Sequence, residues 1–412
     1  MDKSLNIISN IILFLPIALI TGPFFSDLIV SVSAIFFLYY CIKTNNFRSF
    51  NNNLFKLFLL FWVYIIFTSF FSENIVVSLK VSIPYIRFGL FVLLIAYLIN
   101  NKKGYLVKFS ILTIILYCIV LFDSYFQFIF GFNIFGFVSP VQNRLSSFFA
   151  DEMVVGSFLS RLFPFILFCI LIVSKKFNDK IKYLSPLLLI LTDVIIYMSG
   201  ERTSFAILLI INVGFIILIS HMKIIRLITF IISLILITII SYQSTLIKDR
   251  MINQTLNDFE YKDGNLKVFS KVHQDHYETA IKMFADSPLK GVGVKMFRYE
   301  CSKEKFESGK FSCTTHPHHL HLQLLSETGI IGYCFILYLF FFVIRKFIIT
   351  VKLIYIDKKN DKLNDLKNCI LLGVFANLFP LIPSGNFFNN WLSILYFLPI
   401  GFYFLKDIND AK

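Results

Sequence analysis

Apolar segments long enough to cross a lipid bilayer recur along almost the whole chain, and they constrain the fold more than any other feature. A transmembrane helix needs about 20 mostly apolar residues. About twelve segments meet or approach this length: 4–22, 26–42, 54–71, 80–99, 105–130, 152–174, 182–199, 203–220, 223–243, 319–345, 366–383 and 388–405. Because backbone polar groups must be satisfied inside lipid, we expect an all-α polytopic membrane protein with about 12 transmembrane helices.

The composition supports lipid as the solvent of this chain. Of its 412 residues, 57% are hydrophobic and only 16% are charged, so a soluble domain of this length could not bury the apolar surface. The formal net charge of +14 would suit nucleic acid if it were gathered on one face. The Lys and Arg residues instead recur in short loops, and we therefore exclude nucleic acid as a partner.

The positions of these basic residues predict the orientation of the chain. Lys and Arg follow the second, fourth, sixth, eighth and tenth apolar segments, whereas the other short loops contain almost none. The basic residues that decide this are Lys43, Arg48, Lys102, Lys103, Lys175, Lys176, Lys223, Arg226, Lys346 and Lys352. Positively charged loops stay in the cytoplasm. Both termini are therefore expected to be cytoplasmic.

One long polar loop divides the chain into three parts. We expect transmembrane helices 1–9 over residues 1–243, a loop domain outside the cytoplasm over 244–318, and helices 10–12 over 319–412. A connection of this length is usually functional. A short amphipathic helix is expected over 277–285. The loop also contains Cys301 and Cys313, for which a disulfide and two free thiols are equally compatible with the sequence.

Four histidines lie where this loop enters the tenth apolar segment: His316, His318, His319 and His321. Imidazole titrates near neutral pH and transfers protons, so this cluster indicates chemistry at the membrane surface. His316, His318 and His321 could alternatively bind zinc. Their helical spacing suits a zinc site only loosely, and no HExxH motif is present. We therefore expect neither a metal nor a cofactor.

Charged residues within the apolar segments lie toward the same end as the long loop. They are Arg87, Asp123, Arg161, Asp193 and Arg202. Charges inside a membrane usually face a cavity or a partner, so their shared depth predicts one polar chamber. The simpler alternative is that Arg87–Asp123 and Arg161–Asp193 form buried ion pairs.

The segment Gly200–Thr203, with the sequence Gly-Glu-Arg-Thr, opens a membrane helix at the end that faces the long loop. Free backbone amides and the guanidinium of Arg202 would there face the same space, which suits a phosphate or pyrophosphate. An ordinary helix start with an arginine at the membrane interface explains the same residues equally well.

A spaced motif surrounds the histidines. His318 is followed by His319, nine residues, Gly329, two residues and Gly332. This pattern resembles the signature of the O-antigen ligase and polymerase superfamily of bacterial envelope glycosyltransferases, in which Asn, Ser or Gln usually stands where this chain has His319. Three further segments are similar to the family: Phe149–Glu152 with Gly156, Ser157 and Arg161; Ser199–Thr203; and Gly291–Gly293 with Phe297 and Arg298.

The resemblance implies a GT-C-like enzyme of the bacterial inner membrane whose active site faces the periplasm. It implies metal-independent, inverting transfer of a glycan from undecaprenyl diphosphate to a lipid A-core sugar in ligases, or to another lipid-linked glycan in polymerases. By position, His318 would be the general base and Arg202 would hold the pyrophosphate.

Further residues would support this site. We expect Arg161 and Arg87 to help bind the pyrophosphate. The supporting positions are His316, His319, Arg298, Gly329 and Gly332. We favour a ligase over a polymerase of the same superfamily. A polysaccharide transporter or flippase is an alternative of a different class, although internal repeats and charges at the midplane, typical of transporters, are missing. A structural protein of envelope assembly would leave the histidines unexplained.

Overall fold

A computed structural model describes residues 3–141, 144–221, 223–258, 261–262, 265–266, 269–359 and 361–407. Their regular secondary structure is helical, apart from one hairpin of two-residue strands and one isolated β-bridge, and loops connect these elements. The helices before the long loop are α1 (Lys3–Leu13), α2 (Leu15–Ile20), α3 (Pro23–Lys43), α4 (Asn53–Ser69), α5 (Ile75–Ser82), α6 (Ile86–Asn101), α7 (Tyr105–Phe130), α8 (Val155–Lys176), α9 (Leu184–Met198), α10 (Arg202–Leu218) and α11 (Lys223–Gln243).

The long loop and the C-terminal part contain the remaining elements. The loop holds α12 (Thr245–Lys248), α13 (Gln254–Asp258), β1 (Tyr261–Lys262), β2 (Asn265–Leu266), α14 (Lys271–Asp286) and α15 (Phe297–Glu300). It is followed by α16 (Leu320–Val351), α17 (Lys362–Asn377) and α18 (Asn390–Tyr403). The helix expected over 277–285 is confirmed as part of α14, which begins six residues earlier.

Seven helical segments of the described chain are long and apolar enough to cross a membrane, and they coincide with seven of the twelve predicted ones. They are Pro23–Thr44, Ile75–Asn101, Tyr105–Phe130, Val155–Lys176, Lys180–Met198, Lys223–Gln243 and Leu320–Ile356. The other five predicted segments form shorter or broken helices: α1 with α2, α4, α10, α17 and α18. The chain is thus helical and rich in membrane-spanning segments, although the expected count of twelve spans is not reached on length alone.

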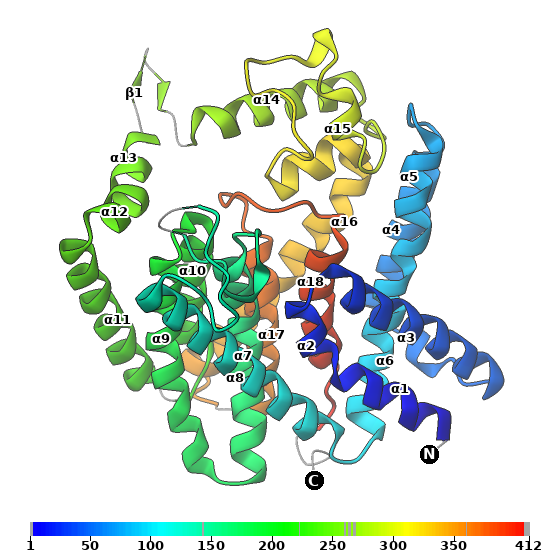
Figure 1. The fold of residues 1–412 in the computed structure, drawn as a ribbon. Helices are drawn as coiled ribbons and strands as arrows, with labels where there is room; N and C mark the ends of the chain where they lie inside the picture. The colour runs from blue at the N-terminus through cyan, green and yellow to red at the C-terminus, as the bar shows by residue number, and fades with distance from the viewer. Residues whose placement is uncertain are drawn as a thin grey trace.

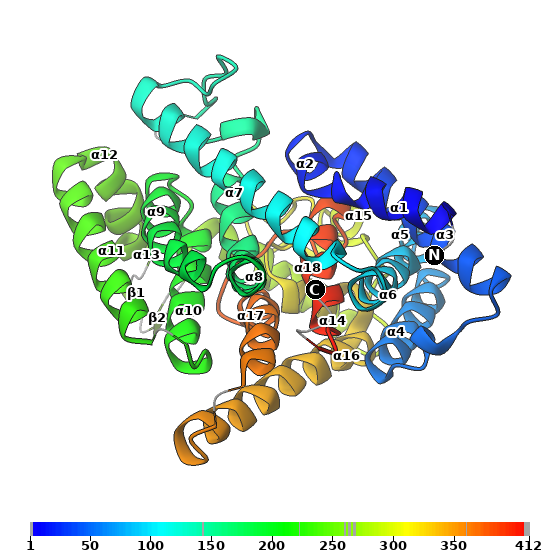
Figure 2. The same cartoon turned by 90° about the horizontal axis from the view of Figure 1, so that it is seen from below.

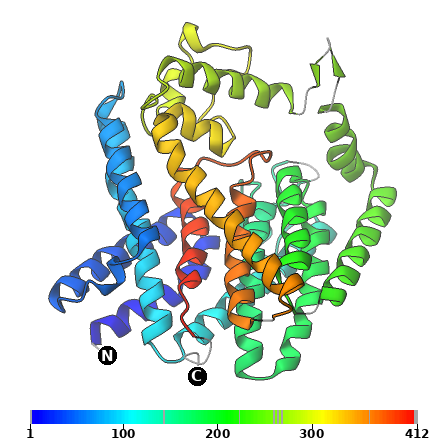
Figure 3. The same cartoon turned by 180° about the vertical axis from the view of Figure 1, so that it is seen from behind.

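The helices form a bundle with a separate cap (residues 244–318) at one end (Figure 1). Seen from below, α3–α6 lie on one side of the bundle and α9–α11 on the other, with α17 and α18 between them (Figure 2). Figure 3 shows α16 running obliquely from the cap across the back of the bundle. A continuous core of buried Leu, Ile and Phe side chains connects α1–α10 with α16–α18.

The end of the bundle opposite the cap holds the ends of several helices. Asn100, at the end of α6, donates to the carbonyl of Phe404 at 3.0 Å and accepts from the amide of Lys406 at 3.0 Å. Lys102 donates to Ser9 on α1. The first helix and the end of α18 are therefore at the same end of the molecule, away from the cap.

Candidate active site

Four imidazole rings meet where the cap joins α16. His316 and His318 lie in the last turns of the cap, and His273 and His276 lie on α14. The ring centroid of His318 is 4.0 Å from that of His316, 5.4 Å from that of His276 and 5.8 Å from that of His273. We call these four residues the imidazole cluster. His318 contacts the other three members and is its centre.

The cluster is closed on one side and open on the other. His276 and His316 are buried, with exposed fractions of 4% and 8%, whereas His318 and His273 are half-buried. A substrate would therefore reach the cluster at His318 and His273.

Burial keeps the imidazole cluster uncharged near neutral pH. It lowers the pKa of His316 to about 3 and that of His318 to about 4, and it also lowers the pKa of His273 and His276. Neighbouring imidazoles lower the pKa of His318 further, because adjacent positive charges repel. The neutral ring is the form that accepts a proton, so His318 is in the state that a general base requires.

His318 also has an unusual backbone. Its φ of 55° lies in the left-handed region, which few residues other than glycine adopt. The carbonyl of His318 accepts a hydrogen bond from the amide of Ser384 at 2.9 Å, which fixes this turn against the segment between α17 and α18. Such strain is of order 1–3 kcal/mol and is common at functional sites.

The other two histidines of the motif anchor α16. His319 is the N-cap of α16: its Nδ1 accepts from the amide of Leu322 at 3.3 Å, so its Nε2 carries the proton and donates to the carbonyl of Pro380 at 2.9 Å. His321 bonds the Tyr333 hydroxyl at 3.0 Å and the Leu378 carbonyl at 2.9 Å. His319 thus caps α16 and also binds the segment that follows α17.

These contacts also bear on the alternative of a zinc site. A zinc ligand needs an unprotonated ring nitrogen that is free to bind. Both nitrogens of His321 are engaged, so it is not available as a third ligand beside His316 and His318. In the described parts of the chain, no group of three His, Cys, Asp or Glu side chains has a geometry that could hold a metal ion.

Gly329 marks the point where the cap is fixed to α16. It interrupts the helix with a φ of 64° and a ψ of −173°, and a Cβ there would lie 2.3 Å from the carbonyl oxygen of Leu289. A Cβ on Gly291 would in turn lie 2.4 Å from the carbonyl carbon of Glu327. The amide of Gly293 donates to the carbonyl of Glu327 at 2.9 Å. The two glycine segments of the family resemblance thus pack backbone against backbone.

Gly332 completes this junction. A Cβ on Gly332 would lie 3.0 Å from the ring of Tyr64 on α4. The Tyr64 hydroxyl contacts the carbonyl of Leu289 in the cap at 3.0 Å and that of Thr328 at 2.9 Å. Gly329 and Gly332 therefore act through structure: they set the height of the cap, and hence of α14, relative to His318.

Glu327 lies at the same junction and is fully buried. Its carboxylate accepts from the amide of Phe297, at the start of α15, at 3.2 Å and from the side-chain amide of Gln323 at 3.0 Å. The bond to Phe297 holds the cap on α16, whereas the bond to Gln323 is made within α16.

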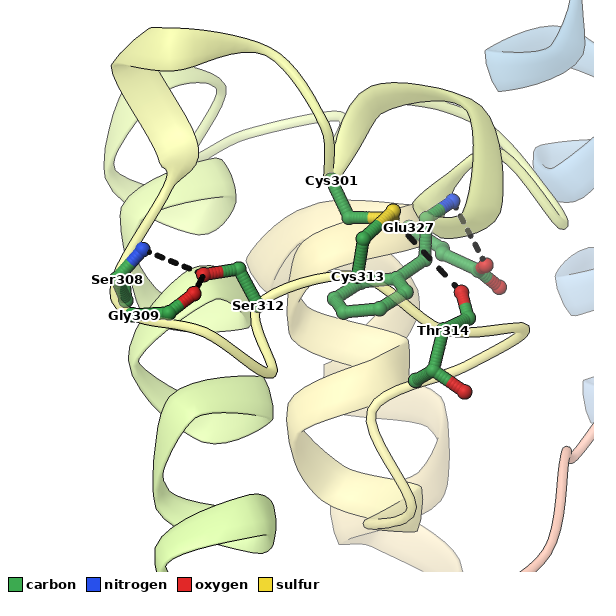
Figure 4. The surroundings of a disulfide bond; sticks show 8 residues. Cys301, Ser308, Gly309, Ser312, Cys313, Thr314 and Glu327 are labelled. Atoms are coloured by element: carbon green, nitrogen blue, oxygen red, sulfur yellow. Dashed lines mark hydrogen bonds between the residues drawn. A yellow bond between two sulfur atoms is a disulfide. The ribbon is translucent and has the colours of Figure 1, made fainter.

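A disulfide closes the chain segment that leads into the imidazole cluster. Cys301 and Cys313 are joined, with their Cα atoms 4.9 Å apart (Figure 4). Of the two alternatives that the sequence left open, a disulfide and two free thiols, the structure contains the disulfide. It shortens the connection between α15 and His316, and the turn at Ser308–Ser312 between the cysteines is held by its own hydrogen bonds.

Arg202 begins α10 and faces the cap. Its Nη1 donates to the carboxylate of Asp258 on α13 at 2.7 Å, and its side chain is 34% exposed. The positive charge of Arg202 contributes to lowering the pKa of His273, while Asp258 raises it. His273 therefore lies within electrostatic reach of Arg202 and in contact with His318.

The residue before Arg202 joins two segments of the family resemblance. Glu201 accepts from the amides of Gly156 at 2.7 Å and Ser157 at 2.9 Å, and from the Ser204 hydroxyl at 2.9 Å. A carboxylate is stabilised at a helix N-terminus, and here it caps the first turn of α8. Glu201 thus fixes α8 against α10 and holds Arg202 in place.

The structure brings the other predicted arginines to different places. Arg161 is buried in α8, donates to the carbonyl and hydroxyl of Ser157, and lines an apolar cavity of about 170 Å³ between α4, α6, α8, α16, α17 and α18. Arg298 is exposed in α15, and its charge lowers the pKa of His316. In the part of the chain that the structure describes, Arg161 makes no contact with the imidazole cluster, whereas Arg298 lies near it.

The alternative of two buried ion pairs within the membrane is wrong in its pairing. Arg87 pairs with Asp27 of α3 at 2.8 Å, because α3 packs against α6. Asp123 instead accepts from the amide of Ile134 at 2.8 Å and from the Ser147 hydroxyl. It therefore holds the loop that follows α7.

Asp193 is likewise not the partner of Arg161. Its carboxylate accepts from the side-chain amide of Asn212 on α10 at 2.8 Å. This bond joins α9 to α10, while the Nη1 atom of Arg161 donates to Ser157 in its own helix. Both carboxylates thus fix neighbouring segments rather than neutralise the predicted arginines.

The sequence prediction missed His273 and His276. Both precede the helix expected over 277–285. Their spacing of three residues was a usable signal, because residues i and i+3 share one face of a helix. Arg250 was also missed: it donates to the carbonyl of Gly200 at 2.9 Å and adds a second guanidinium beside Arg202.

Comparison with known proteins adds one match. A family model described as O-antigen ligase matches residues 186–337, which include α10, the cap and the first part of α16. The matched region contains Arg202, the imidazole cluster and both glycine segments. No curated protein matches this chain.

Proposed function

This chain belongs to the O-antigen ligase superfamily of glycosyltransferase-type membrane enzymes, and we propose that it is a ligase. In this proposal it transfers a glycan from undecaprenyl diphosphate to a hydroxyl of a lipid A-core sugar, without a metal. The supporting observation is the position of His318: a half-buried, neutral imidazole at the open side of a cluster that Arg202 flanks.

The chemistry follows from these groups. His318 takes the proton of the acceptor hydroxyl while the oxygen attacks the anomeric carbon of the donor sugar. The bond between that carbon and the diphosphate oxygen breaks, and the diphosphate leaves with the electron pair. Arg202 stabilises the charge on the leaving group, with Arg250 beside it. Attack opposite the leaving group inverts the anomeric carbon.

We further propose that the chain crosses the bacterial inner membrane about twelve times with both termini in the cytoplasm. The distribution of Lys and Arg over the short loops supports this orientation. The cap, and with it the imidazole cluster, would then face the periplasm. The disulfide between Cys301 and Cys313 supports that side, because disulfides persist in oxidising compartments.

Reconstitution tests the proposed reaction. Purified protein in liposomes receives an undecaprenyl-diphosphate glycan together with two competing acceptors, a lipid A-core and a second lipid-linked glycan. Glycan on the core lipid is the expected result, whereas lengthened lipid-linked chains would identify a polymerase. Donor that only changes leaflet, chemically intact, would support the transporter alternative and overturn the proposal.

Two variants test whether His318 is the general base. His318→Ala should lower transfer by a factor of about 10² or more, as expected for loss of a general base. His221→Gln is the control, since His221 lies away from the cap, where it bonds Asp365, and glutamine keeps a donor for that carboxylate. Normal transfer by His318→Ala would rule out its role as base.

A further inference from the structure

We propose that His276 is the positioning residue of His318: it accepts a hydrogen bond from the imidazolium that His318 becomes when it takes the acceptor proton. The inference rests on the proposed function and extends it to α14, a helix of the cap that the sequence motif does not include. It concerns how the base is held and how its charged form is stabilised.

The placement of the two rings fits this role. Their centroids are 5.4 Å apart and their planes are inclined by only 26°. A linear hydrogen bond of about 3 Å between two ring nitrogens places the ring centroids about 5 Å apart. The contact with His316 is different, since those centroids are 4.0 Å apart and the rings are tilted by 41°. The centroid separation of His276 and His318 therefore allows a hydrogen bond between their rings.

The state of the Nδ1 atom of His276 supports the same role. The side chain is 4% exposed, and Nδ1 is buried with no hydrogen-bond partner among the residues that the structure describes. An unsatisfied buried polar atom is costly, and a phenyl ring would fill the same space without it. The presence of an imidazole at this position is explained if Nδ1 accepts a hydrogen bond during the reaction.

The surroundings leave His318 as the partner. The titratable groups near His276 are His273 and Asp275 on its own helix and His316 and His318 in the turn before α16. The Asp275 carboxylate is paired with Lys271 at 2.5 Å and accepts from the amide of Phe311 at 3.2 Å. Among the described residues Asp275 makes no hydrogen bond to His276, although its charge raises the pKa of that ring.

The step balances with a single proton. The acceptor O–H bond breaks and an N–H bond forms on His318. The opposite N–H of His318 then donates to Nδ1 of His276, and no proton is transferred to His276. After the product leaves, His318 returns the proton to water on its open side. A base oriented by a third group is the arrangement that activates many catalytic hydroxyls.

Two substitutions separate hydrogen bonding from ring packing. His276→Phe keeps a flat ring but no acceptor, whereas His276→Gln keeps an acceptor oxygen without the ring. We expect kcat to fall about tenfold or more in His276→Phe with little change in the KM for the acceptor, and to recover in part in His276→Gln. The matched control is Glu278→Gln, an exposed change two residues along α14 that should leave transfer at the wild-type rate.

The pH profile supplies a readout that a packing defect would not move. Both substitutions remove the imidazole of His276, whose charged form lowers the pKa of His318, but only His276→Gln keeps an acceptor for the imidazolium. The acidic limb of kcat/KM should therefore lie at lower pH in His276→Phe than in His276→Gln. A wild-type rate in His276→Phe, with the acidic limb at the same pH in both variants and with wild type and Glu278→Gln both active, would overturn this inference alone. Absence of transfer in the wild type would instead contradict the proposed function.

Discussion

The guanidinium of Arg202 is held by the carboxylate of Asp258 at 2.7 Å, across the gap between α10 and α13. An anionic diphosphate that binds Arg202 must compete with this carboxylate. We therefore expect Asp258→Asn to lower the KM for the lipid-diphosphate donor several-fold and to leave the KM for the acceptor unchanged. Steady-state kinetics with each substrate varied in turn measure both constants.

Arg202→Lys is expected to act in the opposite direction. Lysine keeps the positive charge but cannot form two parallel hydrogen bonds to a phosphate, so transfer should fall at least tenfold. The loss should persist at saturating donor, because the contact also stabilises the leaving group. A lysine variant with wild-type kinetics would mean that Arg202 is only an anchor at the membrane interface.

Catalysis should tolerate acid better than an ordinary histidine base would. Burial lowers the pKa of His318 to about 4, so the neutral base persists well below pH 6.5. We expect kcat/KM to stay level from pH 7 to about pH 5 and to fall as the pH approaches about 4. An acidic limb centred near 6.5 would show that the base is solvated or lies elsewhere.

The stability of the folded protein should also depend on the protonation of His316 and His318, and acid should lower it. A ring whose pKa is lower in the folded than in the unfolded chain binds fewer protons when folded, so acid favours unfolding. The contribution of both residues is complete above about pH 6.5 and is lost as the pH falls toward about 4 for His318 and about 3 for His316. Thermal unfolding in detergent across this range measures it, and His316→Phe should flatten the dependence.

The close packing of Gly329 against the cap predicts that a side chain at this position lowers activity by disturbing the structure. In Gly329→Ala, the new Cβ meets the carbonyl oxygen of Leu289, and the left-handed backbone adds strain of about 1–3 kcal/mol. The cap should move away from α16 and transfer should fall sharply. Gly373→Ala is the control, since a Cβ there has only ordinary contacts with Pro164. Equal activity in both variants would contradict a role for Gly329 in docking the cap.

The sequence predicted most of the helical segments and half of the imidazole cluster. Apolar length is a local property, so all twelve predicted segments have counterparts in helices of the structure. His316 and His318 were found because a spaced motif surrounds them. His273 and His276 were not, since their approach to His318 depends on how α14 packs on α16, about 40 residues away in the chain.

The sequence also did not predict which charged side chains pair with one another. Arg87 and Asp123 lie at similar predicted depths, which is why they were paired. In the structure, Arg87 forms an ion pair with Asp27, because α3 lies beside α6. Asp123 instead accepts a hydrogen bond from the loop after α7. Depth along a helix is readable from the sequence, whereas the direction a side chain faces depends on which helices are neighbours.

The disulfide between Cys301 and Cys313 predicts both the stability of the cap and its side of the membrane. The bond closes a loop with a sequence separation of 12. Breaking it should lower the free energy of unfolding by about 2–4 kcal/mol, because the unfolded loop gains conformational freedom. Cys301→Ser should therefore melt at a lower temperature than the wild type in detergent, with a parallel loss of transfer as the turn before His316 loosens.

The same variant reports orientation. Cys301→Ser leaves Cys313 as a free thiol in the cap, so a maleimide that cannot cross the membrane should label it in intact spheroplasts. The wild type, oxidised at this position, and the Cys301→Ser/Cys313→Ser double variant should both remain unlabelled there. Labelling of Cys313 only after the membrane is opened would place the cap in the cytoplasm, where neither a disulfide nor a periplasmic glycan acceptor is expected.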